Sequence, residues 1–247
     1  MVLGLFLGKK VHALILAGGE GKRLGSEIPK QFLKLKDRTI LEWAIMPFEK
    51  SENVDEIVVV VNKRFLDFAK ELLGIKKYRK LKSITCGGKT RQESSKLGLD
   101  TISEEDGIVL IHDAVRPFVF KEDIENLLSA LRVFKAVTLS TPVKETVALV
   151  SERESFVVED IPPRERLFTI NTPQGFYISL IKEAHRRAVD DGFFDAPDDC
   201  SLILKYFKEE KVHLIPGTPI NVKITYPIDL KIAEVLLSEK AFGGTKA

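Results

Sequence analysis

The sequence of 247 residues has few cysteines, no long apolar run and no excess of charge of one sign. Cys86 and Cys200 are its only cysteines and neither lies in a CxxC pair, which excludes a disulfide framework and favours a reducing compartment. No apolar run approaches the ~18 residues of a membrane span. The apolar start is followed, not preceded, by Lys9 and Lys10, unlike a signal peptide. We therefore expect a soluble, cytoplasmic protein.

The charge balance argues against a nucleic-acid-binding surface. Lys and Arg number 38 against 36 Asp and Glu, a net charge of +2, whereas nucleic acid needs a segregated basic face. Any bound anion must therefore be held by local groups. A zinc site is not expected either, because no metal-ligand spacing relates the four histidines, His12, His112, His185 and His213.

Apolar, β-branched blocks alternate with helix-length amphipathic segments. The blocks predict strands at 12–16, 57–61, 81–86, 108–111, 136–139 and 212–215. The intervening segments predict helices after a capping box at Thr39–Glu42, near 64–73, 92–102, 121–132, 177–190 and 199–208, and from Pro227. Uninterrupted apolar strands indicate burial on both faces. We therefore predict a doubly wound, mostly parallel α/β sheet of the nucleotidyltransferase, Rossmann-like kind, in a single domain over residues 1–247.

The alternation of strands and helices breaks near Thr141. From about 142 to 172, polar and apolar residues alternate, as in Val147 to Val150. This pattern predicts an antiparallel β-arm that protrudes from the sheet. Because a two-stranded ribbon is only marginally stable alone, we expect the arm to pack against another subunit in a homodimer.

A glycine-rich segment, residues 16–25, follows the first apolar block. Glycines let a backbone approach a ligand and aim N–H groups at phosphate oxygens. The segment fails the P-loop pattern, which needs glycine at Leu16 and Ser or Thr at Arg23. It fails the dinucleotide fingerprint too, which needs glycine at Leu24 and an acidic residue at Asn62. A hydride-transfer enzyme is therefore disfavoured. Nearby cations at Arg23 and Lys30 still favour an anion-binding turn over a purely structural one.

Two further strand ends carry candidate residues. The third strand leads into residues 86–95, where Arg91 and Ser94 could contact a base or ribose. For Ser94 alone, a polar helix N-terminus is the simpler interpretation. The fourth strand ends at Asp113, which could hold a divalent cation, because hard cations take oxygen ligands. The alternative is a structural ion pair between Asp113 and Arg116.

Three other features of the sequence involve ionisable side chains. Lys223 lies shortly before the helix that starts at Pro227, a setting suited to phosphate. His112 is interpreted as a packing residue. The pair Asp198–Asp199 precedes a helix, and we interpret it as a helix cap.

Taken together, these residues resemble the 2-C-methyl-D-erythritol 4-phosphate cytidylyltransferases of the non-mevalonate isoprenoid pathway. The resemblance runs from about His12 to Val235. It rests on Ala-Gly-Gly-x-Gly-x-Arg (17–23), Pro-Lys-Gln (29–31), Gly-Gly-x-x-Arg-x-x-Ser (87–94), His-Asp-Ala-x-Arg-Pro (112–117), Pro-Val-Lys-Glu-Thr (142–146), Thr-Pro-Gln (172–174) and Asn-Val-Lys-Ile-Thr (221–225).

The resemblance implies transfer of CMP from CTP to a small polyol phosphate, with release of pyrophosphate and dependence on Mg²⁺. It implies that Arg23 and Lys30 stabilise charge at the α-phosphate, and that Asp113 and Lys223 are the other catalytic groups. Asp113 would bind a substrate hydroxyl or the metal, which could otherwise bind through the CTP phosphates. The nucleotide would be held by Ala17, Gly18, Gly19, Gly21, Gly88 and Ser94, with Gly88 and Ser94 at cytosine. The polyol phosphate would be held by Asp113, Arg116, Thr146, Arg164 and Lys223, with the arm exchanged between subunits.

The sequence departs from the family at Lys89, where Asp is common, so the resemblance assigns no ribose contact there. The sister family of ribitol-5-phosphate cytidylyltransferases shares most of the motifs, including His-Asp-Ala-Val-Arg-Pro-Phe at 112–118. The leading hypothesis is thus the methylerythritol phosphate enzyme. The same chemistry on ribitol 5-phosphate is the alternative, and a nucleotide-binding regulator without turnover is a third.

Overall fold

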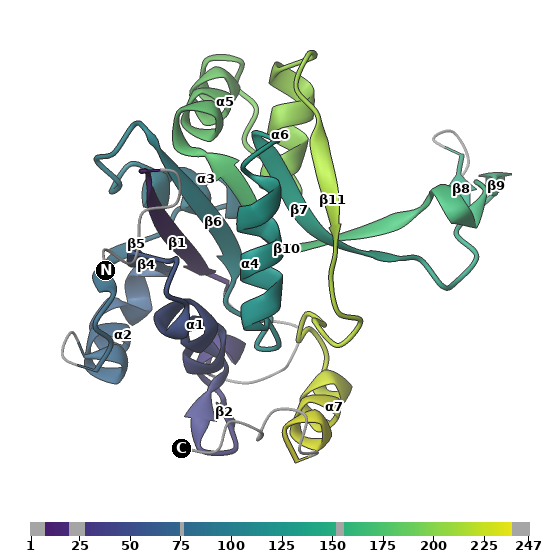
Figure 1. Ribbon diagram of the computed structural model, residues 1–247. Coiled ribbons are helices and arrows are strands. Elements are labelled where there is room, and N and C mark those ends of the chain that lie inside the picture. Colours follow the sequence, from purple (N-terminus) through teal and green to yellow (C-terminus); the bar gives the residue numbers. More distant parts are fainter. Residues whose placement is uncertain (1–7, 20–27, 75–76, 152–155, 239–247) are drawn as a thin grey trace.

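A seven-stranded sheet forms the centre of the computed structural model, which describes residues 8–19, 28–74, 77–151 and 156–238 (Figure 1). The strand order is β11-β7-β10-β6-β1-β4-β5. β10 runs antiparallel to both of its neighbours, and the other pairs in this sheet are parallel. The strands are β1 (Lys10–Ala17), β4 (Glu56–Val61), β5 (Leu81–Cys86), β6 (Gly107–Asp113), β7 (Ala136–Pro142), β10 (Phe168–Tyr177) and β11 (Val212–Pro216).

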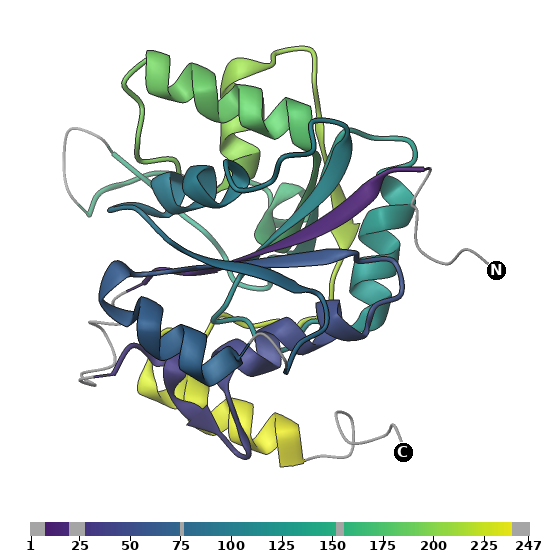
Figure 2. The same cartoon turned by 90° about the vertical axis from the view of Figure 1, so that its left-hand side faces the viewer.

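Helices cover both faces of the sheet (Figure 2). One face packs against α1 (Ile40–Lys50), α2 (Leu66–Leu73) and α4 (Lys121–Ala130). The other packs against α3 (Arg91–Leu99), α5 (Ile178–Asp190) and α6 (Asp199–Tyr206). Successive apolar residues of β1 alternate between these two cores, with Ile15 in one and Leu16 in the other. Burial on both faces therefore explains the continuous apolar runs of the strands.

The predicted doubly wound α/β fold is confirmed, and most element boundaries lie within a few residues of those predicted. α1 begins with the expected capping box, since Thr39 Oγ1 accepts a hydrogen bond from Glu42 N and Glu42 Oε2 accepts one from Thr39 N. The periodicity did not predict β10. Its buried residues Asn171, Thr172 and Gln174 are polar, so the segment does not match an apolar central strand.

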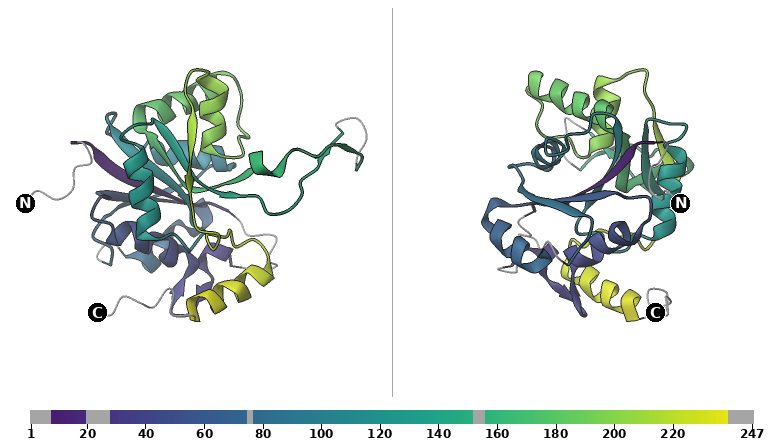
Figure 3. Two further views of the ribbon diagram at one scale, coloured as in Figure 1. Left: turned by 45° about the vertical axis from the view of Figure 1, so that its right-hand side comes forward. Right: turned by 60° about the vertical axis from the view of Figure 1, so that its left-hand side comes forward.

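The arm is shorter than predicted. β10 begins at Phe168 and pairs with β7, so residues 168–172 belong to the sheet. The projecting part comprises the described residues 143–151 and 156–167, in which β8 (Leu149–Val150) pairs antiparallel with β9 (Val158–Asp160). It extends away from the sheet in both views of the molecule (Figures 1 and 3). Apolar side chains along it are exposed, including Leu149, Val150, Phe156, Val158 and Ile161.

A third, smaller core lies below the sheet. There α7 (Pro227–Ser238) packs beside the hairpin of β2 (Lys34–Leu35) and β3 (Arg38–Thr39). The segment before α7 is tied to the end of β6, because Ile224 N donates to Val115 O at 2.9 Å. This bond brings Lys223 close to Asp113. Among the described helices, none is long and apolar enough to cross a bilayer.

Candidate active site

A cavity of about 860 Å³ lies at the carboxyl ends of β1, β4, β5 and β6. Its lining includes the turn after β1, the start of the segment after β4, residues 87–91 after β5, and Asp113 at the end of β6. Ligands of open α/β sheets bind at this edge, and the volume is in the range of small-molecule sites. The strand ends identified from the sequence therefore meet in one cavity.

The described lining carries an excess of positive charge. Its acidic side chains are Glu93 and Asp113. Its basic side chains are Lys30, Lys63, Lys89, Arg91 and Lys223. A concave site with an excess of one charge concentrates ligands of the opposite sign. The cavity thus suits an anionic ligand, although the whole chain is nearly neutral.

Buried side chains fix the turn after β1. Gln31 Nε2 donates to Ala17 O at 2.7 Å and to Gly19 O at 2.9 Å. Lys30, also buried, lines the cavity and donates from Nζ to Ile224 O at 2.8 Å. The sequence analysis predicted no role for Gln31, although it belongs to the motif at 29–31. The one sign of its role in the sequence is a polar residue between Lys30 and the apolar Phe32. The predicted Gly21 and Arg23 lie outside the described residues.

The turn after β5 is held by Ser94. Its Oγ accepts a hydrogen bond from Gly88 N at 3.1 Å and donates one to Thr90 O at 2.9 Å. A Cβ on Gly87 would lie 2.6 Å from Ser94 Oγ and 3.1 Å from Val60 Cγ1, so any larger residue there would force Ser94 to move. Gly88 and Ser94 both line the cavity, as predicted, and the hydroxyl of Ser94 also shapes the turn at the start of α3.

Asp113 is surrounded by three cations. Its carboxylate lies 3.2 Å from Arg91 Nε, 2.9 Å from Lys223 Nζ and 3.8 Å from Arg116 Nε. Burial acts to raise the pKa of the Asp113 carboxyl, but the charges of Arg91 and Lys223 outweigh it and hold that pKa well below its usual range. Asp113 is therefore ionised. Arg116, considered as its structural partner, also donates from Nη1 to Asn171 Oδ1 and Asn221 O.

His112 is a buried packing residue, as predicted. Its Nε2 lies 3.0 Å from Arg116 O, which can only accept, so Nε2 carries the proton. Nδ1 then accepts from Thr172 Oγ1 at 2.9 Å, and Thr172 Oγ1 accepts from Asp113 N at 3.1 Å. Burial lowers the pKa of His112 to about 4. The neutral ring thus anchors the backbone of Asp113.

Arg91 connects Asp113 to a second buried carboxylate. Asp199 accepts hydrogen bonds from Arg91 Nη1 at 2.7 Å, Ser95 Oγ at 2.6 Å and His185 Nε2 at 2.9 Å. Asp198 caps α6 through Ser201 N, which confirms the cap predicted there. Asp199 lies in the first turn of α6, where an acidic residue complements the helix dipole, and its side chain also forms an ion pair between α6 and α3. Adjacent acidic residues before a helix gave no sign of this.

The two substrate-binding residues predicted on the arm lie apart from the cavity in the described structure. Thr146 is exposed, and Arg164 donates from Nη1 to Lys144 O at 3.0 Å within the arm. Neither lines the cavity that contains Asp113 and Lys223. A single chain therefore does not bring the two groups of predicted substrate contacts together.

Comparisons with known proteins point to one family for the whole described chain. The family model described as 2-C-methyl-D-erythritol 4-phosphate cytidylyltransferase matches residues 11–239. A protein of that name from Thermobifida fusca is 39% identical over 234 residues, covering 92% of this chain and 93% of that protein. A Vibrio parahaemolyticus protein named ribitol-5-phosphate cytidylyltransferase is 38% identical over 229 residues, covering 91% and 94%.

Solved structures resemble the whole fold. The 4-diphosphocytidyl-2C-methyl-D-erythritol synthase of Anaerococcus prevotii superposes with a TM-score of 0.81 at 31% identity, covering 94% of this chain and 99% of that one. The 2-C-methyl-D-erythritol 4-phosphate cytidylyltransferase of Thermus thermophilus superposes with a TM-score of 0.70 at 29% identity, covering 91% and 98%.

Proposed function

The chain belongs to the 2-C-methyl-D-erythritol 4-phosphate cytidylyltransferase family, and we propose that it transfers CMP from CTP to 2-C-methyl-D-erythritol 4-phosphate, releasing pyrophosphate. The observation that carries the proposal is the cation-lined cavity at the carboxyl ends of the strands, within a match that spans residues 11–239. Ribitol 5-phosphate is the second candidate acceptor, because a relative named for that activity is nearly as similar in sequence.

The acceptor phosphate needs no general base. A phosphate monoester has a second pKa of about 6, so it is mostly dianionic at neutral pH. Its oxygen attacks the α-phosphorus of CTP in line, the new P–O bond forms, and the bond to the bridging oxygen breaks as pyrophosphate leaves. His112 is not assigned a proton transfer, because both of its ring nitrogens are hydrogen-bonded within the protein.

Positioned cations supply the catalysis in this mechanism. Lys30 and Lys223 both line the cavity, and each is held by an identified acceptor, Ile224 O or Asp113 Oδ2. Fixed cations stabilise the charge that develops on the phosphoryl oxygens without having to reorganise. Asp113 orients Lys223 and can accept a hydrogen bond from an acceptor hydroxyl. We assign Arg23 to the α-phosphate on family resemblance.

Asp113 is the side chain predicted to hold Mg²⁺. Mg²⁺ favours carboxylate and phosphate oxygens, but both oxygens of Asp113 already face Arg91 or Lys223. Asp113 therefore does not fit a magnesium ligand unless one of these cations moves. We propose that Mg²⁺ binds through the CTP phosphates, where it supplies charge neutralisation.

A homodimer would complete the acceptor site. Thr146 and Arg164 are predicted to hold the acceptor phosphate but lie on the arm, away from the cavity of their own chain. The arm exposes Leu149, Val150 and Val158, and a patch of this kind marks an interaction surface. We propose that each subunit extends its arm over the cavity of its partner.

The first experiment measures pyrophosphate release with CTP and Mg²⁺, comparing 2-C-methyl-D-erythritol 4-phosphate with D-ribitol 5-phosphate. A preference for the former supports the proposal. A preference for the latter overturns the acceptor while leaving the mechanism. CTP binding without pyrophosphate release from either acceptor would favour a regulator without turnover.

A further inference from the structure

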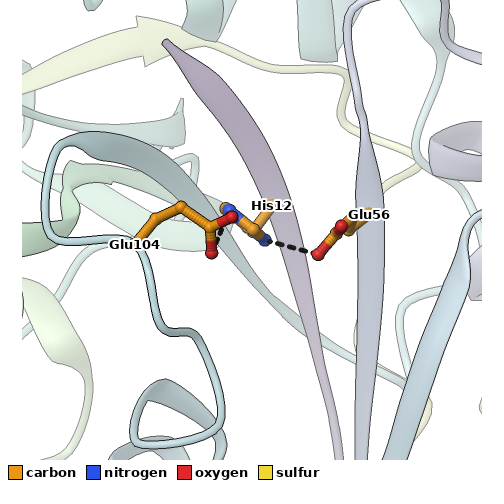
Figure 4. A group of neighbouring side chains, drawn as sticks. All are labelled: His12, Glu56 and Glu104. Atoms are coloured by element: carbon orange, nitrogen blue, oxygen red, sulfur yellow. Dashed lines mark ion pairs between the residues drawn. The ribbon is translucent and has the colours of Figure 1, made fainter.

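A second cluster of ionisable side chains lies at the opposite end of the sheet from the cavity. His12 lies near the start of β1 and pairs in register with Glu56 at the start of β4. Glu104 approaches from the segment before β6, on the other side of the His12 ring (Figure 4). The three residues come from separate segments, so no sequence spacing relates them.

The His12 ring lacks hydrogen-bond partners. It is only 1% exposed, and neither ring nitrogen has a hydrogen-bond partner among the described residues. Nδ1 lies 3.7 Å from Glu56 Oε2, and Nε2 lies 3.5 Å from Glu104 Oε2. A neutral imidazole carries one N–H. Whichever tautomer forms, one nitrogen lone pair therefore faces a carboxylate, and this arrangement calls for a cation.

The surrounding charges do not supply that cation. Lys10 Nζ bonds the other oxygens of the two carboxylates, at 2.7 Å from Glu104 Oε1 and 3.4 Å from Glu56 Oε1. Lys82 Nζ lies 3.6 Å from Glu56 Oε1, and Asp55 adds a third carboxylate nearby. Lys10 and Lys82 thus pair with the Oε1 atoms, whereas the Oε2 atoms face the ring, and the charge of Asp55 also acts on Lys80. The neutral imidazole is the form that binds metals.

We propose that His12, Glu56 and Glu104 form a binding site for a divalent transition-metal ion, for which Zn²⁺ is the best match. One imidazole nitrogen and two carboxylate oxygens are zinc ligands, and a water can take the fourth position. The imidazole disfavours Mg²⁺ and Ca²⁺, which prefer oxygen ligands alone. The tertiary structure thus brings together a set of zinc ligands that the spacing of the histidines in the sequence did not predict.

The ligands must close around the ion. One atom from each residue lies within 4.8 Å of the others, whereas ligands at about 2.0–2.2 Å from zinc lie closer together. An ion bound to one ring nitrogen requires the glutamate that faces the other nitrogen to turn toward it. Glu56 is 22% exposed and Glu104 is 26% exposed, which leaves either side chain room to turn. Lys10 is 45% exposed and can withdraw into solvent. The bound ion would tie together the starts of β1 and β4 and the segment before β6.

The test is calorimetric titration of chelator-treated full-length protein with Zn²⁺, with Co²⁺ absorption as a second readout. We expect one zinc ion per chain and a Co²⁺ spectrum of nitrogen and oxygen ligation. Glu104→Gln should weaken zinc binding by at least about tenfold. Lys10→Gln should tighten it by about tenfold, because it removes a competing cation. The control is Asp106→Asn, an exposed carboxylate two residues from Glu104 that bonds Lys9, and it should bind zinc like the parent.

Three outcomes would overturn the site: no saturable zinc binding, binding that survives Glu104→Gln, or no gain in affinity from Lys10→Gln. The Lys10→Gln variant keeps the test decisive even if Glu104→Gln folds poorly. A doubly protonated His12 seen by NMR at neutral pH, without zinc binding, would also reject the metal in favour of a proton. Pyrophosphate release should be unchanged in all variants, which separates this test from that of the proposed function.

Discussion

Lys30 is the described cation that the mechanism places nearest to the reacting phosphates. It is buried, lines the cavity and is held by Ile224 O. Lys30→Ala should lower kcat roughly 10²–10³-fold at saturating substrates, the loss typical of one preorganised donor. The measurement is steady-state pyrophosphate release. Lys34→Ala, an exposed lysine four residues on, is the control. Near-parental turnover of Lys30→Ala would contradict the assignment.

Asp199 is a positioning residue, because it acts on the cavity only through Arg91. Asp199→Asn keeps the shape of the side chain but removes the charge that faces Arg91 Nη1 at 2.7 Å. Breaking a buried ion pair costs about 3–5 kcal/mol when one charge is left behind, so we expect a loss of about 3 kcal/mol in unfolding free energy. KM for CTP should also rise, since Arg91 lines the cavity.

Asp195→Asn is the matched control for this variant, because Asp195 is an exposed acidic residue shortly before α6. Denaturant unfolding and steady-state kinetics should be compared for the two. If Asp199→Asn were no less stable than Asp195→Asn, the ion pair would not hold α6 and α3 together.

His112 gives stability a defined pH dependence. Its folded pKa of about 4 lies below the ordinary value of about 6.5, because the ring is buried. The unfolded chain therefore binds the proton more readily. The contribution is complete above about pH 6.5 and is lost as the pH falls toward about 4, a change of about 3 kcal/mol. Urea unfolding of the parent and His112→Gln over this range measures it. Parallel stability curves would contradict the prediction.

The turn between β5 and α3 packs closely around Gly87. A Cβ at Gly87 would lie 2.6 Å from Ser94 Oγ, the atom that holds Gly88 N. Gly87→Ala should therefore displace the turn and weaken CTP binding by about tenfold or more, an effect of 1–2 kcal/mol. Calorimetric titration with CTP measures it. Gly217→Ala is the control, because its Cβ would meet only ordinary contacts from 3.4 Å. Unchanged affinity in Gly87→Ala would disprove the close-packing argument.

At the scale of elements, the sequence predicted those strands that a local run of apolar residues marks. Apolar blocks predicted β1, β4 and β6, and the ends of these strands led to Asp113 and the cavity. β10 was not predicted, because its buried polar residues are satisfied by partners distant in sequence. Thr138 Oγ1, for example, donates to Asn171 O, and Gln174 Nε2 donates to Asp198 Oδ2. Such partners exist only once the chain has folded.

The same limit applies to the site. Arg23, Lys30, Asp113 and Lys223 were predicted as the catalytic groups. The last three line one cavity, and Arg23 lies outside the described residues. The contacts by which Gln31 and Asp199 support the site were not predicted, because the role of a buried polar side chain is recognised from its partners. The partners of Asp199 are on α3 and α5, and nothing in the local sequence identifies them.

At the scale of the whole molecule, the proposed exchange of arms predicts how mixed subunits behave. Arg164→Ala should leave the cavity intact but remove an acceptor contact supplied to the partner, so kcat/KM for the acceptor should fall while CTP affinity is retained. Lys30→Ala disables the cavity but leaves the arm intact. Neither homodimer should therefore turn over efficiently.

Mixing the two variants separates exchange of arms from a site built within one chain. In a heterodimer with exchanged arms, one site combines both lesions and the other has none. Random pairing of equal amounts should then restore about a quarter of parental activity. Pyrophosphate release is measured after the subunits are dissociated and reassembled together, with separately reassembled variants as the control. If each arm served its own cavity, every site in the mixture would carry one lesion and no activity would return.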